Sequence, residues 1–137
     1  MNKARMLHTM LRVGDMARSV EFYTHVMGMR VVRTFDQPKD NYSLTFLGYG
    51  DESETCVLEL TYNYGVTEYK MGEAYGHIAI GVDDCYQACA DVSSRGGKIV
   101  REAGLLEGGH EVIAFIEDPD GYWIELIERP ADWFQGG

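Results

Sequence analysis

The sequence has little positive charge. It carries 12 Lys and Arg against 22 Asp and Glu in 137 residues, a formal net charge of -10. Nucleic acids and anionic membranes attract an excess of Lys and Arg, so neither is expected as a partner. The chain also lacks an apolar run of membrane-spanning length and a recognisable signal peptide. We therefore expect a cytoplasmic protein that acts on a small molecule.

Cysteine is scarce as well. There are three, Cys56, Cys85 and Cys89, and no C-x-x-C pair. An odd count without that spacing argues against a disulfide framework and against a Cys-based zinc site. Cys85 and Cys89 lie four positions apart on a predicted helix, so we expect both to pack in the core.

What the chain does contain is a repeated pattern. Residues 8–15 and 77–84 both fit His-x-x-aliphatic-x-Val-x-Asp, and residues 57–61 and 123–127 share an aliphatic–Glu–Leu core. This repetition indicates an internal duplication inside a single domain that spans residues 1–137. The first module covers about residues 5–63 and the second about residues 75–128.

Each copy places one His and one Glu in an apolar strand. Glu59 follows His8 by 51 positions and Glu125 follows His77 by 48, so the copies differ by a short loop. A lone His in such a strand is more often a core residue than a ligand, but a buried Glu is costly unless it is paired or coordinated. If the modules pack with pseudo-two-fold symmetry, the four side chains converge on one divalent cation.

Hydrophobic periodicity predicts the same order of elements in both modules, strand–helix–strand–strand–strand. The class is α+β, with two tandem β-α-β-β-β modules. The expected strands of the first module cover 6–13, 29–34, 42–47 and 56–61, around a helix over 16–27. Those of the second cover 76–82, 98–102, 110–116 and 122–128, around a helix that ends near residue 94.

Capping residues and a helical stripe support both helices. Asp15 begins the first helix and Gly28 ends it, while Asp83 or Asp84 begins the second. The buried stripe of the first helix is expected to contain the apolar residues at 3–4 spacing, Met16, Val20, Tyr23 and Met27.

The proposed ligands, His8, Glu59, His77 and Glu125, form an N₂O₂ set with open positions. Such a set suits Ni²⁺, Co²⁺, Fe²⁺, Mn²⁺ or Zn²⁺, and ligand type alone does not select among them. A cation of this kind acts as a Lewis acid on substrate oxygens, and a carboxylate that leaves it can move protons. His25 and His110 have no counterpart in the other copy, so we interpret both as non-ligands.

Other polar residues near the predicted site are candidates for substrate binding. Arg12 shares a strand face with His8, and Asn63 shares one with Glu59 if that strand continues. Both are placed to bind a substrate carboxylate, with an ordinary strand-end Arg as the alternative for Arg12. The glycine-rich loop 104–109 offers backbone N–H groups to an anion, although an ordinary turn is the favoured interpretation.

These motifs make the chain resemble the glyoxalase I family (lactoylglutathione lyases), of the short bacterial type in the vicinal-oxygen-chelate superfamily. The resemblance covers about residues 5–128. It rests on M-L-H-T-M-L-R-V-G-D, F-Y-x-x-V-M-G-M, F-L-G-Y-G, V-L-E-L-T-Y-N, Y-G-H-I-A-I and F-I-E-D-P-D-G-Y-W-I-E-L-I, at 6–15, 22–29, 46–50, 57–63, 75–80 and 115–127.

The resemblance implies a homodimer with its sites between subunits, where His8 and Glu59 of one chain meet His77 and Glu125 of the other. Each site would hold one divalent metal, Ni²⁺ or Co²⁺ rather than Zn²⁺. The substrate would be the hemithioacetal of methylglyoxal and glutathione, converted through an enediolate to S-D-lactoylglutathione in methylglyoxal detoxification. Glu125 would be the base, with Glu59 serving in the partner step.

One departure from the family concerns the thiol. Related sequences carry Lys in the loop before Gly108-Gly109, where this chain has Glu107, which would repel a glutathione carboxylate. Either Arg12 and Asn63 suffice, Lys98 or Arg101 compensates, or the thiol differs.

Other functions remain open at this stage. A metal-dependent dioxygenase of the same fold needs three ligands rather than four, and a metal-free drug-sequestering dimer leaves four polar residues in apolar strands unexplained. The tail 129–137 either covers a neighbouring surface or frays.

Overall fold

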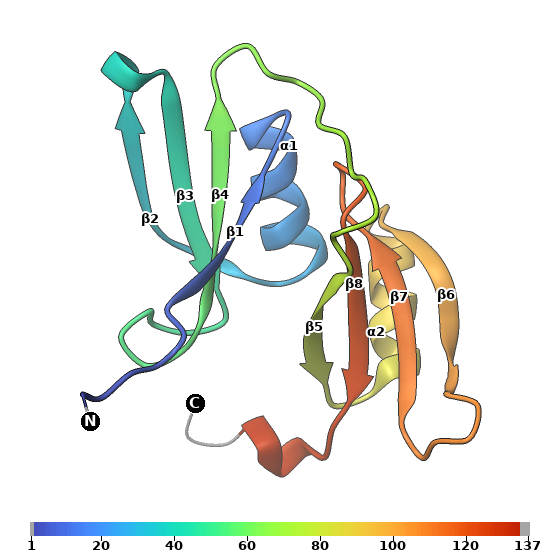
Figure 1. Cartoon of the computed structure of the whole chain (residues 1–137). Coiled ribbons are helices and arrows are strands. Elements are labelled where there is room, and N and C mark those ends of the chain that lie inside the picture. Colours follow the sequence, from blue (N-terminus) through green and yellow to red (C-terminus); the bar gives the residue numbers. More distant parts are fainter. Residues whose placement is uncertain (1, 135–137) are drawn as a thin grey trace. The chain divides into compact units, whose positions relative to one another are not determined.

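The computed structural model describes residues 2–134. The chain divides between Tyr69 and Lys70 into two compact units, and each is described here by itself (Figure 1). Each unit contains one four-stranded mixed sheet and one α-helix, so the predicted α+β fold of two β-α-β-β-β modules is confirmed. That both units belong to one domain over residues 1–137 stays a prediction. Within residues 2–134, every helix is too short or too polar to cross a membrane.

The first module begins with a strand and a helix and continues with three strands. Its elements are β1 (His8–Arg12), α1 (Met16–Glu21), η1 (Phe22–Val26), β2 (Arg30–Gln37), η2 (Pro38–Asp40), β3 (Tyr42–Gly48) and β4 (Val57–Asn63). The sheet order is β1-β4-β3-β2, with β1 parallel to β4 and the other neighbours antiparallel.

The second module repeats this arrangement. It contains β5 (His77–Val82), α2 (Cys85–Ser94), β6 (Lys98–Leu105), β7 (Val112–Glu117) and β8 (Trp123–Glu128), followed by η3 (Ala131–Phe134). The sheet order is β5-β8-β7-β6, and β5 runs parallel to β8. One inner strand of each sheet, β4 or β8, therefore lies beside the strand that carries the module's predicted His ligand.

Along β4 and β8, side chains of the core alternate with side chains of the predicted site. Leu58 and Leu60 in β4 are 7% and 0% exposed, and Ile124 and Leu126 in β8 are both 0% exposed. They belong to the core between each sheet and its helix, and α2 contacts β6, β7 and β8 in this way (Figure 1). Because successive side chains of a strand point to opposite faces, the Glu between each pair of core residues lies on the other face.

The first helix differs from the prediction of one α-helix over 16–27. Regular α-helix ends at Glu21 and a π-helical turn follows, closed by the Met27 N–H, which donates to the Phe22 carbonyl at 3.0 Å. The Thr24 hydroxyl donates to the Val20 carbonyl at 2.7 Å. This side-chain bond competes with the backbone ladder and accompanies the wider turn.

The buried residues of this helix also differ from the prediction. Of the predicted stripe only Tyr23 is fully buried, and the other buried positions of α1 and η1 are Ser19, Phe22 and Val26. The buried residues keep the 3–4 spacing of an α-helix, so the predicted stripe had the right period but was wrong in its position on the helix. In α2, which is regular, Cys85 and Cys89 are buried as predicted, and Val92 is buried with them.

The predicted caps are present in both helices. Asp15 accepts the Arg18 N–H at 3.0 Å, and Asp84 rather than Asp83 accepts the Gln87 N–H at 3.0 Å. Gly28 follows the first helix with φ of 75°, a conformation that favours glycine.

Several strands extend beyond their predicted ends. β2 continues to Gln37, β4 to Asn63 and β6 to Leu105, so Gly104 lies in a strand instead of the predicted loop. In the tail, the Phe134 ring packs above Gly81 of β5. The described part of the tail thus covers the edge strand of its own module, and residues 135–137 lie outside the described residues.

Candidate metal and substrate site

The first module brings one predicted His–Glu pair together. His8 Nε2 lies 3.1 Å from Glu59 Oε1. The parallel register of β1 and β4 sets Met10 opposite Glu59, so His8 reaches the carboxylate diagonally across the two strands. The side chains are 37% and 14% exposed, which places the imidazole at the surface and the carboxylate deeper in the sheet face.

The second module places its pair in the same way. His77 Nε2 lies 3.2 Å from Glu125 Oε1, with side chains 41% and 16% exposed. Here Ala79 is the residue opposite Glu125 in the register of β5 and β8. The duplication seen in the sequence is therefore reproduced as a duplicated polar pair.

A phenylalanine accompanies each pair, and the sequence interpretation missed it. Phe46 meets His8 edge-on at 5.5 Å between ring centroids and 80°, and Phe115 meets His77 at 5.2 Å and 82°. Each Phe stands opposite its Glu in the antiparallel register. The sequence does contain this repeat, because Phe46 follows His8 by 38 positions and Phe115 follows His77 by the same 38.

The two carboxylates have few partners. Among residues 2–134, no Lys or Arg pairs with either of them. Glu59 accepts one hydrogen bond, from the Thr61 hydroxyl to Oε2 at 3.0 Å. A carboxylate that is mostly withdrawn from water without a cationic partner is costly, which favours a bound cation at this place.

The chemistry of the donors fits a divalent metal. Each module offers one imidazole nitrogen and one carboxylate oxygen about 3 Å apart, the ligand types that suit first-row divalent ions. In the described residues no group of three or more His, Cys, Asp or Glu is gathered in a metal-binding cluster. One module by itself therefore supplies a pair of ligands, which is fewer than a tightly held transition metal takes.

The predicted substrate residues lie on the strands that carry the first pair. Arg12 ends β1 and is opposite Thr61, and Asn63 ends β4 on the face of Glu59. Asn63 Nδ2 donates to the Tyr69 hydroxyl at 3.0 Å. The strand that the sequence prediction required for Asn63 is thus present.

Residues interpreted as non-ligands lie apart from both pairs. His25 and His110 are exposed, and neither is part of a His–Glu pair among the described residues. Glu107 is exposed in the turn between β6 and β7, where the Gly109 N–H donates to the Leu106 carbonyl at 2.9 Å. That bond is typical of an ordinary turn, the interpretation favoured from the sequence.

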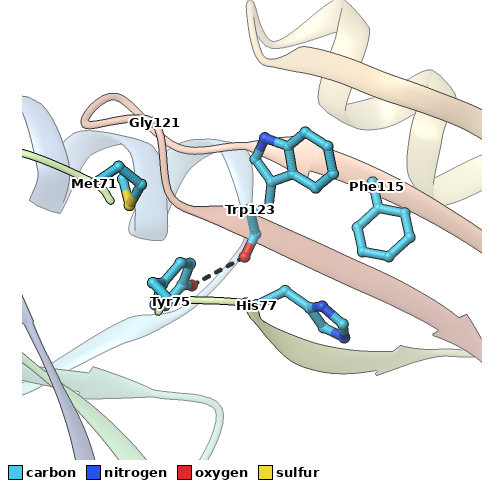
Figure 2. Close-up of a pocket in the computed structure, with 7 residues that line it drawn as sticks. Met71, Tyr75, His77, Phe115, Gly121 and Trp123 are labelled. Carbon is cyan, nitrogen blue, oxygen red and sulfur yellow. Dashed lines mark hydrogen bonds between the residues drawn. The ribbon is translucent and has the colours of Figure 1, made fainter. Parts of the chain in front are cut away.

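A pocket opens beside the second pair. Its volume is about 390 Å³, and it is lined by Met71, Tyr75, Gly76, His77, Phe115, Gly121 and Trp123 (Figure 2). The lining is mostly apolar and aromatic, and His77 is the only predicted ligand in it. The volume is within the range of small-molecule sites.

Three groups in this module, Tyr75, Cys85 and Cys89, have raised pKa values, with burial as the main cause. Burial raises the pKa of Tyr75 to about 12, and its hydroxyl donates to the Trp123 carbonyl at 3.0 Å, which supports the pocket wall (Figure 2). Burial also raises the pKa of Cys85 to about 12. Tyr75 and Cys85 therefore stay protonated near neutral pH.

The doubled module, with a His–Glu pair on one sheet face of each copy, defines a class of α+β protein built from two β-α-β-β-β modules. The family model described as Glyoxalase/Bleomycin resistance protein/Dioxygenase superfamily matches residues 5–126, and the chain belongs to this superfamily. The predicted family resemblance is confirmed.

Several proteins similar to this chain carry the name glyoxalase I or lactoylglutathione lyase. The chain is 59% identical over 125 residues to a lactoylglutathione lyase of Escherichia coli O157:H7, covering 91% of this chain and 93% of the other. A trypanothione-dependent glyoxalase I of Leishmania major matches at a TM-score of 0.83 and 55% identity, covering 92% of this chain and 87% of that chain. Glyoxalase I of Zea mays matches at a TM-score of 0.90 and 49% identity over 92% of this chain, which spans 45% of the maize chain.

Proposed function

We propose that this protein is a lactoylglutathione lyase. It isomerises the hemithioacetal of methylglyoxal and glutathione to S-D-lactoylglutathione and so removes methylglyoxal. The observation that carries the proposal is the duplicated His–Glu pair in a chain 59% identical to a protein with this activity in its name.

The metal site is proposed to form between two copies of the chain. His8 and Glu59 of one subunit join His77 and Glu125 of the partner subunit, which makes the active form a homodimer. Each module has only two ligands of its own, so a second pair is needed to complete a four-ligand set. Ni²⁺ or Co²⁺ is proposed in preference to Zn²⁺.

When bound, the cation supplies Lewis-acid stabilisation of negative charge on two neighbouring substrate oxygens. Glu125 takes the proton from C1 of the hemithioacetal through a carboxylate oxygen and returns it to C2. The proton of the C1 hydroxyl passes to the C2 oxygen, so one C–H bond and one O–H bond break and one of each forms. Glu59 is the partner carboxylate. Phe115 and Trp123 restrict water around His77, because they line the same pocket.

Arg12 and Asn63 are proposed to bind a carboxylate of the thiol. They end neighbouring strands on the site face, and a guanidinium gives a strong charge-assisted contact to a carboxylate. The cytoplasm is the proposed compartment, and the three free cysteines fit its reducing conditions.

The test is a metal-reconstitution series on stripped protein. Thioester formation from methylglyoxal and glutathione is followed after adding Ni²⁺, Co²⁺, Zn²⁺, Mn²⁺ or Mg²⁺ separately. We expect no activity without metal and the highest activity with Ni²⁺ or Co²⁺. Glu68→Gln, at an exposed position away from both pairs, is the matched control for carboxylate substitutions. No thioester with any metal would reject the proposal.

A second thiol remains a specific alternative. The Leishmania major protein is trypanothione-dependent, and in this chain Glu107 stands where the family resemblance predicts a Lys. The test compares kcat/KM for the hemithioacetals of glutathione and trypanothione in the wild type and in Glu107→Lys. A preference for trypanothione that Glu107→Lys reverses would establish this alternative. The dioxygenase alternative is disfavoured, because the chain offers four ligands and the reported relatives are glyoxalases.

A further inference from the structure

The two carboxylates are placed alike but are held differently. Glu59 Oε2 accepts a hydrogen bond from the Thr61 hydroxyl at 3.0 Å. Thr61 lies two residues further along β4, on the same face, and is only 8% exposed. Glu59 therefore lies beside His8 Nε2 at Oε1 and accepts a hydrogen bond from Thr61 at Oε2.

The second module has no equivalent hydroxyl. The residue two positions after Glu125 in β8 is Ile127, which has no polar group in its side chain. In the described part of the chain, Glu125 contacts His77 Nε2 at 3.2 Å and accepts no hydrogen bond from a hydroxyl or amide. Glu125 thus has one restraint fewer than Glu59.

This difference matters because the two roles make opposite demands. A carboxylate that only binds metal is improved by an outer hydrogen bond, which fixes its orientation. A carboxylate that also moves a proton between two carbon atoms must leave one orientation for another. An additional charge-assisted hydrogen bond opposes that movement.

We propose that Thr61 is a positioning residue that keeps Glu59 as a fixed metal ligand, and that Ile127 at the equivalent place leaves Glu125 free for proton transfer. The inference rests on the proposed function and assigns the two roles from the hydrogen bonds of this chain. Thr61 touches neither substrate nor metal in this scheme and acts through Glu59.

The first experiment measures Ni²⁺ affinity of stripped, full-length protein by competition with a chelator. Thr61→Val keeps the shape and removes the hydroxyl, and it is expected to weaken Ni²⁺ binding about 10-fold or more, as loss of an outer-shell partner does. Thr61→Ser restores a hydroxyl and is expected to bind within about threefold of the wild type. At saturating Ni²⁺, Thr61→Val is expected to keep most of its kcat.

The second experiment makes the reciprocal change. Ile127→Thr adds a hydroxyl beside Glu125 and is expected to lower kcat about 10-fold, with little change in KM and no loss of Ni²⁺ affinity. Ile127→Val, the matched control without a hydroxyl, is expected to behave as the wild type.

The outcomes separate this inference from the proposed function. The inference is overturned if Thr61→Val binds Ni²⁺ as tightly as the wild type. It is also overturned if Ile127→Thr keeps full kcat. A wild-type protein that forms no lactoylglutathione rejects the proposed function instead, while the affinity measurement requires no turnover. If Thr61→Val does not fold, Ile127→Thr in the other module decides alone.

Discussion

The two modules share their site geometry and differ in what surrounds it. In both, an imidazole contacts a Glu at 3.1 to 3.2 Å and meets a Phe ring edge-on at 80° to 82°. In the first, Arg33 lies over Phe46 with Cζ 3.7 Å from the ring centroid, whereas in the second Trp123 lies beside Phe115 at 5.7 Å between centroids. Duplication has thus kept the ligands in place while their neighbours diverged, which allows chemically identical ligands to take different roles.

The largest effect is expected from the carboxylates themselves. Glu125→Gln should lower kcat by about 10²–10⁴-fold while the protein still binds Ni²⁺, because it removes a general base and leaves an amide oxygen as a ligand. Glu59→Gln should act mainly through weaker Ni²⁺ binding. Steady-state kinetics at several Ni²⁺ concentrations separate the two. A Glu125→Gln variant that binds Ni²⁺ and keeps full activity would exclude it as the base.

The aromatic rings should differ in their contribution to stability. Phe46 is 3% exposed, so Phe46→Ala should lower the free energy of unfolding by about 3–5 kcal/mol. Phe115 is half-buried beside a pocket, so Phe115→Ala should cost less. Urea unfolding measures both, with Phe35→Ala, at a 43% exposed position, as the control. Equal losses for Phe46 and Phe115 would contradict the difference in packing.

Removing the N-cap side chain of either α-helix should lower the stability of the protein by a similar amount. Asp15→Ala and Asp84→Ala each remove one side-chain acceptor at a helix N-terminus, and each should cost about 1 kcal/mol. Asp→Asn at the same positions keeps the acceptor and should cost much less. Thermal unfolding of the four variants tests this, and a clearly larger loss at one cap would show that the two helices are not equivalent.

The smallest effect on stability is expected for Arg33, which lies over Phe46 in the first module. Arg33 pairs with Glu52 at 2.6 Å between Nε and Oε1, but its side chain is 51% exposed. Arg33→Met keeps the apolar stem over Phe46 and should cost about 0.5–1 kcal/mol, since exposed cation–π contacts and ion pairs are weak. The loss should shrink in 1 M salt. A loss of several kcal/mol that is independent of salt would assign Arg33 a core role.

Most of the site could be predicted from the sequence because the same residues recur at nearly the same spacing in both modules. The repeated His and Glu gave the four candidate ligands, and strand periodicity put each Glu opposite to the core face. The Phe partners were missed because a Phe in a strand is ordinary core material unless the copies are compared position by position. Thr61 was missed for a related reason, since its importance comes from a contrast with Ile127.

The helix boundary shows a limit of a different kind. The spacing of apolar residues alone predicts an ideal α-helix over 16–27, and it does not indicate that the turn after Glu21 widens. The hydrogen bond from the Thr24 hydroxyl to the Val20 carbonyl is a local competitor of the backbone ladder, which hydrophobic periodicity does not represent. Capping residues were more reliable, because one side chain and one backbone N–H define the interaction.

The loop that joins the last two strands differs in length between the two modules. Residues 49–56 join β3 to β4, and residues 118–122 join β7 to β8, which accounts for the whole difference between the spacings of 51 and 48. The longer link carries Glu52, which reaches Arg33. A chimera that grafts the short link onto the first module would keep His8 and Glu59 in the register of β1 and β4 and would remove the contact between Glu52 and Arg33. Both modules would then have the same spacing between His and Glu.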